Sequence, residues 1–314
     1  MRLPSRLVLA AVLTACASSA TPAPDVGPGT AAFAAQAAAV RARADAVVAA
    51  DAARTDSVAR RGYLDGVMAV MTPDVTYLRG GQPMAFGQLS VHTMLAAALP
   101  VRGTVFRWQP LRVGVSRDGL AAYTVGIAAS SVAGDSGRGT LRLDRYIAYW
   151  RREADGAWRV AAYAEVGPPP AEAPPLANPG RPRPLAEMPR RDSLAHVFMA
   201  TDSAFSALAV RDGLASAFGT YAASDAMTLT GSLVSVGPAA IRGQFAGPDG
   251  GVLRWHAVAG DAANSGDLGF TVGEYTFASS SGGARHGKYL TVWAAQPSGV
   301  WRFVADGGNP NPVP

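Results

Sequence analysis

The spacing of apolar residues divides the chain into two halves that have the same order of elements. Each half opens with apolar positions three and four residues apart, the helical period, in residues 31–60 and 193–210. Most of the remaining residues of each half alternate between apolar and polar positions, as half-buried strands do, with turns at glycine-rich segments. Helices followed by a run of antiparallel strands indicate an α+β fold rather than a parallel α/β fold.

The strand pattern predicts matching hairpins in the two halves. Glycine-rich turns separate their arms, which are residues 123–131 and 141–152 in the first half and 270–279 and 287–295 in the second. An earlier strand is expected at 75–78 and 226–230, and the last strand begins at Trp158 or Trp301. We expect Trp150 and Trp293, in mid-strand, to be buried, and Trp158 and Trp301, beside a turn, to be partly exposed.

The two halves also repeat each other residue by residue. Asp51, Gly62 and Asp74 recur 151 positions later as Asp202, Gly213 and Asp225, and Trp108 recurs 147 positions later as Trp255. Tyr146, Trp150 and Trp158 recur 143 positions later as Tyr289, Trp293 and Trp301. All six tryptophans fall into these pairs, so we infer a duplication of a whole domain.

A proline-rich segment separates the repeats. Residues 167–189 contain nine prolines, which remove backbone donors and fix φ, so the segment cannot join a sheet or helix. We therefore predict a first domain at 31–167, a linker at 168–190 and a second domain at 191–314.

The N-terminus predicts export and lipid anchoring. Two arginines and the apolar run 7–15 are typical of a signal peptide covering residues 1–15. Leu13, Thr14, Ala15 and Cys16 resemble the lipobox of bacterial lipoproteins, which implies acylation of Cys16, a tether over 16–30 and a place on the periplasmic or outer side of the cell envelope. Ala17 after the cysteine favours the outer membrane by the same resemblance. The alternative is an ordinary secretory signal in which the cysteine has no role.

Composition and charge exclude several classes of function. The chain is 49% hydrophobic and 16% charged, which suits packed cores rather than disorder. Its formal charge of +5 is spread over the chain without a basic block, so a nucleic-acid partner is not expected. The single cysteine and four separated histidines give no metal motif, and no cofactor motif is present.

The final strands resemble a known family. The segment 287–310, GKYLTVWAAQPSGVWRFVADGGNP, and the preceding TVGEYTF, 271–277, are similar to SnoaL-like domains of the nuclear transport factor 2-like superfamily, which also holds ketosteroid isomerases. Residues 146–160 carry a more divergent copy. The resemblance implies two tandem cone-shaped domains, each a curved, mostly antiparallel sheet wrapped around a long N-terminal helix, with a pocket at the open end.

Aromatic and polar residues of the predicted strands are candidates for these pockets. They are Trp108, Tyr123 and Tyr146 in the first domain and Trp255, His256, Tyr275, Tyr289 and Asp306 in the second. Core packing is the alternative role for the aromatic residues, because curved sheets bury rings against their helix.

Catalysis by general acid–base chemistry would need a carboxylate base and a hydrogen-bond donor facing it. Asp225 or Asp306 is the candidate base, and Tyr275 or Tyr289 the candidate donor. Asp225 equally fits a turn beside its strand. Asp51 and Asp202, in the long helices, face either the pocket or a packing contact.

Three functions therefore remain open from the sequence. The first is binding of a small apolar or amphipathic ligand, or of a protein partner, by a lipid-anchored envelope protein. The second is an isomerase or cyclase type of enzyme working in the second domain. The third is a structural role, in which the convex faces of the sheets pair within one chain or between two chains.

Overall fold

The structure is a computed structural model that describes residues 28–132, 140–168, 191–231, 233–247, 251–279 and 282–312. Domain 1 contains α1 (Pro28–Ala52), α2 (Arg54–Arg61), α3 (Tyr63–Met68), β1 (Met71–Leu78), β2 (Ala85–Phe86), α4 (Gly87–Ala96), β3 (Val105–Val115), β4 (Ala121–Val132), β5 (Thr140–Arg152) and β6 (Trp158–Val166). Domain 2 contains α5 (Arg191–Asp212), α6 (Leu214–Tyr221), β7 (Ala222–Thr230), β8 (Leu233–Val236), α7 (Pro238–Gln244), β9 (Val252–Ala262), β10 (Leu268–Ala278), β11 (Ala284–Ala295) and β12 (Trp301–Pro310).

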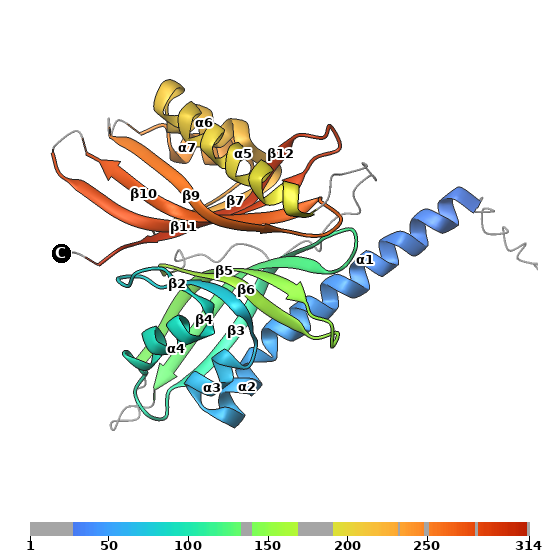
Figure 1. Ribbon diagram of the computed structural model, residues 1–314, viewed down its shortest axis with the longest axis vertical. Coiled ribbons are helices and arrows are strands. Elements are labelled where there is room, and N and C mark those ends of the chain that lie inside the picture. Colours follow the sequence, from blue (N-terminus) through green and yellow to red (C-terminus); the bar gives the residue numbers. More distant parts are fainter. Residues whose placement is uncertain are drawn as a thin grey trace, which may run out of the picture.

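Each domain is built on one curved sheet of six strands. The strand orders are β2-β1-β6-β5-β4-β3 and β8-β7-β12-β11-β10-β9, which are the same order in the two repeats. All neighbours run antiparallel except β1 with β6 and β7 with β12, which are parallel. The predicted α+β class, with two tandem domains of curved sheet and long N-terminal helix, is confirmed (Figure 1).

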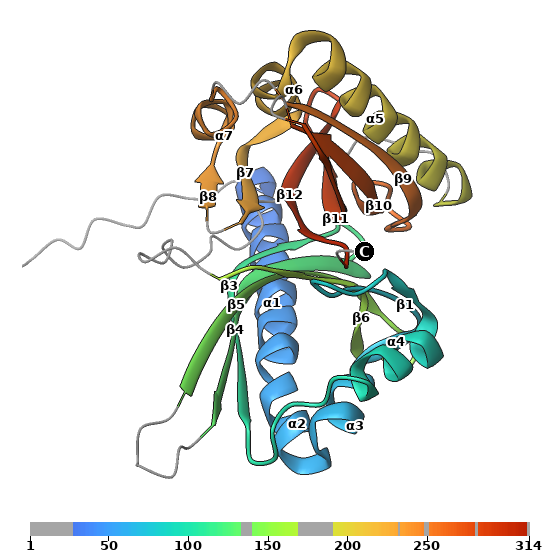
Figure 2. The same cartoon turned by 90° about the vertical axis from the view of Figure 1, so that its left-hand side faces the viewer.

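The long helices α1 and α5 pack on the outer, concave sides of the two sheets (Figures 1 and 2). The repeated glycines stand at helix ends: Gly62 follows α2 and Gly213 follows α5, with φ of +85° and +83°. A side chain with a Cβ is strained in that conformation. Within the described part of the chain, no helix combines the length and hydropathy needed to cross a bilayer.

The first strand of each sheet begins earlier than the sequence predicts. The pattern predicts strands at 75–78 and 226–230, but β1 begins at Met71 and β7 at Ala222. In β1 the pairing with β6 shifts register between Met71 and Thr76, and Pro73 lies inside that irregular stretch. A proline is tolerated there because a bulged residue need not donate to the ladder.

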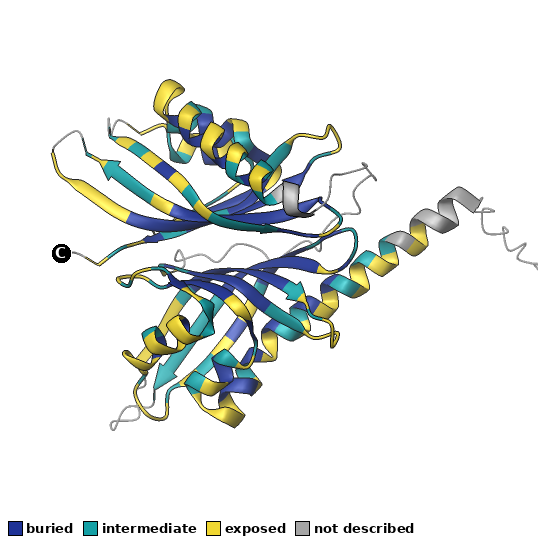
Figure 3. Cartoon of the chain, viewed as in Figure 1, coloured by how far each residue is buried: buried dark blue, intermediate teal, exposed yellow. Residues whose placement is uncertain are grey.

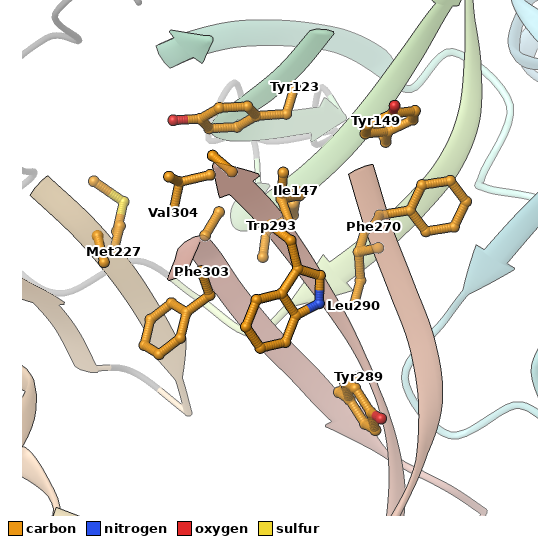
Figure 4. Close-up of a cluster of buried hydrophobic side chains, with 14 of the residues drawn as sticks. Tyr123, Ile147, Tyr149, Met227, Phe270, Tyr289, Leu290, Trp293, Phe303 and Val304 are labelled. Atoms are coloured by element: carbon orange, nitrogen blue, oxygen red, sulfur yellow. The ribbon is translucent and has the colours of Figure 1, made fainter. Parts of the chain in front are cut away.

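The convex faces of the two sheets pack against each other within the chain. Tyr149 of β5 and Phe270 of β10 lie with ring centroids 4.7 Å apart (Figure 4). A Cβ added at Gly307 of β12 would stand 3.1 Å from Ile147 and 3.2 Å from Val166. One hydrophobic cluster therefore joins both domains. The intrachain pairing considered from the sequence is thus present in the structure.

Because each sheet is covered on both sides, its central strands are buried at successive positions (Figure 3). In β11, Leu290 and Val292 face domain 1, whereas Tyr289 and Trp293 face α5. The prediction for the tryptophans is confirmed: Trp150 and Trp293 are fully buried, and Trp158 and Trp301 are partly exposed.

Polar contacts surround the apolar contact between the sheets. The Asn309 amide donates to the carbonyl oxygens of Leu78 at 3.0 Å and Glu165 at 2.6 Å, both in domain 1. In the other direction, the buried Arg145 donates to the carbonyl oxygens of Gly231 and Leu233 in domain 2. Both sets of bonds lie near the C-terminal ends of β6 and β12, where they fix the relative position of the two sheets.

We predict that Trp293→Ala lowers the free energy of unfolding by about 3–5 kcal/mol, because it leaves a cavity between β11 and α5. Trp301→Ala, the control, should cost clearly less, since Trp301 is partly exposed and packs mainly on Phe198. Urea unfolding of both variants measures the difference. Equal losses would mean that the burial assigned to Trp293 is wrong.

Candidate functional site

Helices α1 and α5 each place one aspartate in the centre of a concave face. Asp51 and Asp202 occupy equivalent positions of the repeat and are both fully buried. A buried carboxyl group requires partners, since removing it from water is costly. The two domains supply these partners in different ways.

Domain 1 neutralises its aspartate with an arginine. Arg54, one helical turn further on, is itself buried and pairs with Asp51 at 3.2 Å. The Tyr146 hydroxyl donates to the second carboxylate oxygen of Asp51 at 2.6 Å. The Arg54 guanidinium carbon lies 4.6 Å from the ring centroid of Trp108 and 4.5 Å from that of Tyr163. Arginine and aromatic rings thus occupy the centre of this concave face.

Domain 2 holds the equivalent aspartate without a cation. Asp202 accepts hydrogen bonds from Trp255 Nε1 at 2.7 Å, Tyr289 Oη at 3.0 Å and Thr271 Oγ1 at 2.5 Å. Phe205 stands where the repeat has Arg54. Burial raises the pKa of Asp202 to about 6, although the three donors counteract this shift.

A second carboxyl group, Asp306 of β12, lies on the same face of domain 2. It is opposite Thr291 of β11 and Thr228 of β7 in the sheet, and the Thr291 hydroxyl donates to Asp306 Oδ2 at 2.5 Å. Desolvation raises the pKa of Asp306 to about 7, and the charge of Asp202 also acts to raise it. The side chain is half-buried rather than fully enclosed. Two protonatable carboxyl groups therefore lie on one concave face.

Most of the residues predicted to line pockets lie on the concave faces. Trp108 and Tyr146 are in domain 1, and Trp255, Tyr275, Tyr289 and Asp306 are in domain 2. Tyr275 is half-buried, at the next rung of the sheet beyond Tyr289. Trp108, Tyr146, Trp255 and Tyr289 are buried, so they contact core side chains as well.

Three predicted site residues lie elsewhere. Tyr123 points from the convex face into the cluster between the domains (Figure 4). His256 follows Trp255 in β9 and is exposed on the opposite face of the sheet. Asp225, a candidate base, has an exposed side chain at the edge of the domain contact, where its carbonyl and carboxylate oxygens face Arg112. Strand alternation places Tyr123 and His256 on the faces opposite the concave ones. Asp225 lies in the bulged start of β7, away from the concave face.

Sequence reasoning missed Arg54 and the pairing of Tyr77 with Glu165. The repeat itself carried a signal for the first, since Arg54 aligns with Phe205 at the same offset as Asp51 with Asp202. Tyr77 donates to Glu165 at 2.8 Å, and burial raises the pKa of that glutamate. These two residues lie 88 positions apart, on strands whose pairing cannot be read from local pattern.

The structure also has a cavity outside the two aspartate sites. It has a volume of about 480 Å³ and lies on domain 1, lined by α2 and α3, the start of β1, Gln88 of α4 and the β5–β6 turn. Among the described residues, no group of three or more His, Cys, Asp or Glu side chains is arranged to hold a metal ion.

Comparison with solved structures found single-domain likenesses. A ketosteroid isomerase-like protein from Erwinia carotovora atroseptica is 18% identical, covering 42% of this chain and 98% of its own, with a TM-score of 0.30. An NTF2-like protein with a cystatin-like fold from Novosphingobium aromaticivorans is 16% identical, covering 44% and 88%, with a TM-score of 0.32. The CaMKII hub of S. rosetta is 16% identical, covering 39% and 94%, with a TM-score of 0.33.

No family model and no curated protein matches the chain. The structural likenesses are too distant to bear on activity, so function has to be inferred from the side chains.

The raised pKa of Asp306 gives a testable pH dependence. The folded chain keeps this proton to about pH 7, whereas the unfolded carboxyl loses it near its ordinary value of about 4. The contribution of Asp306 to stability is therefore greatest in acid and is lost as pH rises towards 7, and Asp202 acts in the same direction. Asp306→Asn should reduce the loss of unfolding free energy between pH 5 and 8 by about 2 kcal/mol.

Urea unfolding at several pH values measures this effect, with Asp225→Asn as the control, because Asp225 is exposed. An Asp306→Asn variant with the same pH dependence as the unaltered chain would contradict the assignment.

Proposed function

We propose that this chain is a lipid-anchored protein of the bacterial cell envelope whose second domain binds a small apolar or amphipathic ligand on its concave face. The observation that carries the binding site is the contrast between the domains. Asp51 is neutralised by Arg54, whereas Asp202 and Asp306 have no basic side chain bound to them in the described part of the chain. Polar groups converging on an otherwise aromatic concave face are typical of ligand sites.

Domain 1 has a supporting role in this proposal. The Arg54 side chain and the rings around it occupy the centre of its concave face, and its convex face positions the sheet of domain 2. The site of domain 2 thus lies on a sheet whose convex face is fixed against domain 1, which suits a preorganised binding surface.

A second candidate is an enzyme of the isomerase or cyclase type. The specific observation that favours it is a carboxyl group with a pKa of about 7, Asp306, near a second with a pKa of about 6, Asp202. A general acid or base works best when its pKa lies near the ambient pH. In such an enzyme Asp306, which is half-buried, exchanges the proton, and Tyr289 and Trp255 hold Asp202 in place.

Binding is tested with N-phenyl-1-naphthylamine, a neutral apolar probe whose fluorescence rises in an apolar site. We expect the purified protein to bind it, and Tyr275→Ala to weaken binding about tenfold, because the ring supplies apolar contact area. Tyr63→Ala in domain 1, where Tyr63 packs on Phe106, is the matched control and should leave binding unchanged. Failure of the probe to bind, or an effect of Tyr63→Ala alone, would refute the site.

Anchoring is tested at Cys16. We expect Cys16→Ser to move the protein from the detergent phase to the aqueous phase on partitioning, because acyl chains supply the membrane affinity. Ser19→Ala is the control and should stay in the detergent phase. A Cys16→Ser protein that is processed normally and still enters the detergent phase would exclude lipidation at this residue.

A further inference from the structure

The concave face of domain 2 continues beyond the carboxyl groups towards the free ends of β10 and β11. There Phe277 of β10 pairs with Leu253 of β9 on one side and Arg285 of β11 on the other. These strand ends are exposed or half-buried in the described chain (Figure 3). They are the entrance to the face that holds Asp306.

The aromatic rings of this face lie flat on the sheet. A Cβ at Gly287 would collide with the Tyr275 ring, and a Cβ at Gly273 would collide with the Tyr289 ring. Glycine at these positions lets each ring cover the neighbouring strand instead of standing upright. The half-buried Tyr275 ring thus forms an aromatic floor at the entrance, which suits contact with an apolar chain, and the buried Tyr289 ring continues this floor inwards towards Asp306.

At the entrance, Arg285 is a cation without an anionic partner among the described residues. Its guanidinium carbon stands 5.3 Å from the ring centroid of Phe277, and no carboxylate of the described residues forms an ion pair with it. The equivalent residue of domain 1, Arg142, is bound by Asp144 at 2.6 and 3.2 Å. Domain 1 therefore pairs both Asp51 and Arg142 with opposite charges. Domain 2 leaves the equivalent residues, Asp202 and Arg285, without such pairs among the described residues.

We propose that the ligand of domain 2 is an elongated amphiphile with a carboxylate head group, bound with its carboxylate at Arg285 and its apolar body on the floor of Tyr275 and Tyr289. This inference rests on the proposed function and names the class of ligand. Arginine binds carboxylates with two parallel hydrogen bonds, which gives geometry as well as charge. From Arg285 to Thr291, opposite Asp306, the strand advances six residues, or about 20 Å, which is comparable to the length of an extended fatty acid.

The test compares two competitors that differ only in the head group. Dodecanoate and 1-dodecanol are titrated at pH 7 against the protein loaded with N-phenyl-1-naphthylamine. We expect dodecanoate to bind about tenfold more tightly than dodecanol, because only the carboxylate forms a charge-assisted pair with Arg285.

Three variants assign that preference to a residue. Arg285→Gln should weaken dodecanoate about tenfold and leave the affinities for dodecanol and for the neutral probe unchanged, which also shows that the site is folded. Arg142→Gln, the equivalent change in domain 1, and Arg254→Gln, an exposed arginine beside Trp255 in β9, should leave all three affinities unchanged.

Two results would overturn the inference and are distinguishable. If the probe binds but the two competitors are equal, or Arg142→Gln acts like Arg285→Gln, the carboxylate preference is refuted while binding by domain 2 stands. If the probe does not bind at all, the proposed function fails and this inference fails with it.

Discussion

The fold depends on one contact, the packing of two convex apolar sheet faces against each other. Each curved sheet has one side covered by its own helix and one side that only a second sheet can cover. Because the domain is duplicated within one chain, every first sheet has a second sheet to pair with. Leu290, Ile147 and Val166 are therefore buried although they point away from their own helices.

That contact leaves the concave faces free to diverge. In domain 1, Asp51 with Arg54 and Arg142 with Asp144 are closed ion pairs inside or at the edge of the face. In domain 2, Phe205 stands at the position that corresponds to Arg54, so Asp202 has no equivalent cation beside it. Asp202 and Asp306 are instead held by neutral hydrogen-bond donors, and the ligand site that we propose for domain 2 rests on this contrast with domain 1.

The sequence was informative wherever a pattern is local or repeated. Helical spacing, strand alternation and the paired tryptophans predicted the α+β class, the two domains and the burial of Trp150 and Trp293. The pattern was not informative where both faces of a strand are buried, because alternation then marks no single inner face. The sequence predicts a pocket position for Tyr123, for example, but this residue faces domain 2. The pairing of Tyr77 with Glu165 depends on a parallel contact between distant strands, which no local pattern encodes.

We expect the two sheets to hold each other through their convex faces without the help of the linker. A protease site introduced between residues 169 and 190 allows the purified chain to be cut, and analytical ultracentrifugation then reports whether the halves separate. We expect one species that contains both halves in equal amounts. Ile147→Asp should split it, because the substitution places a buried charge in the contact. Halves that sediment as separate, folded monomers after cleavage of the unaltered sequence would contradict this expectation.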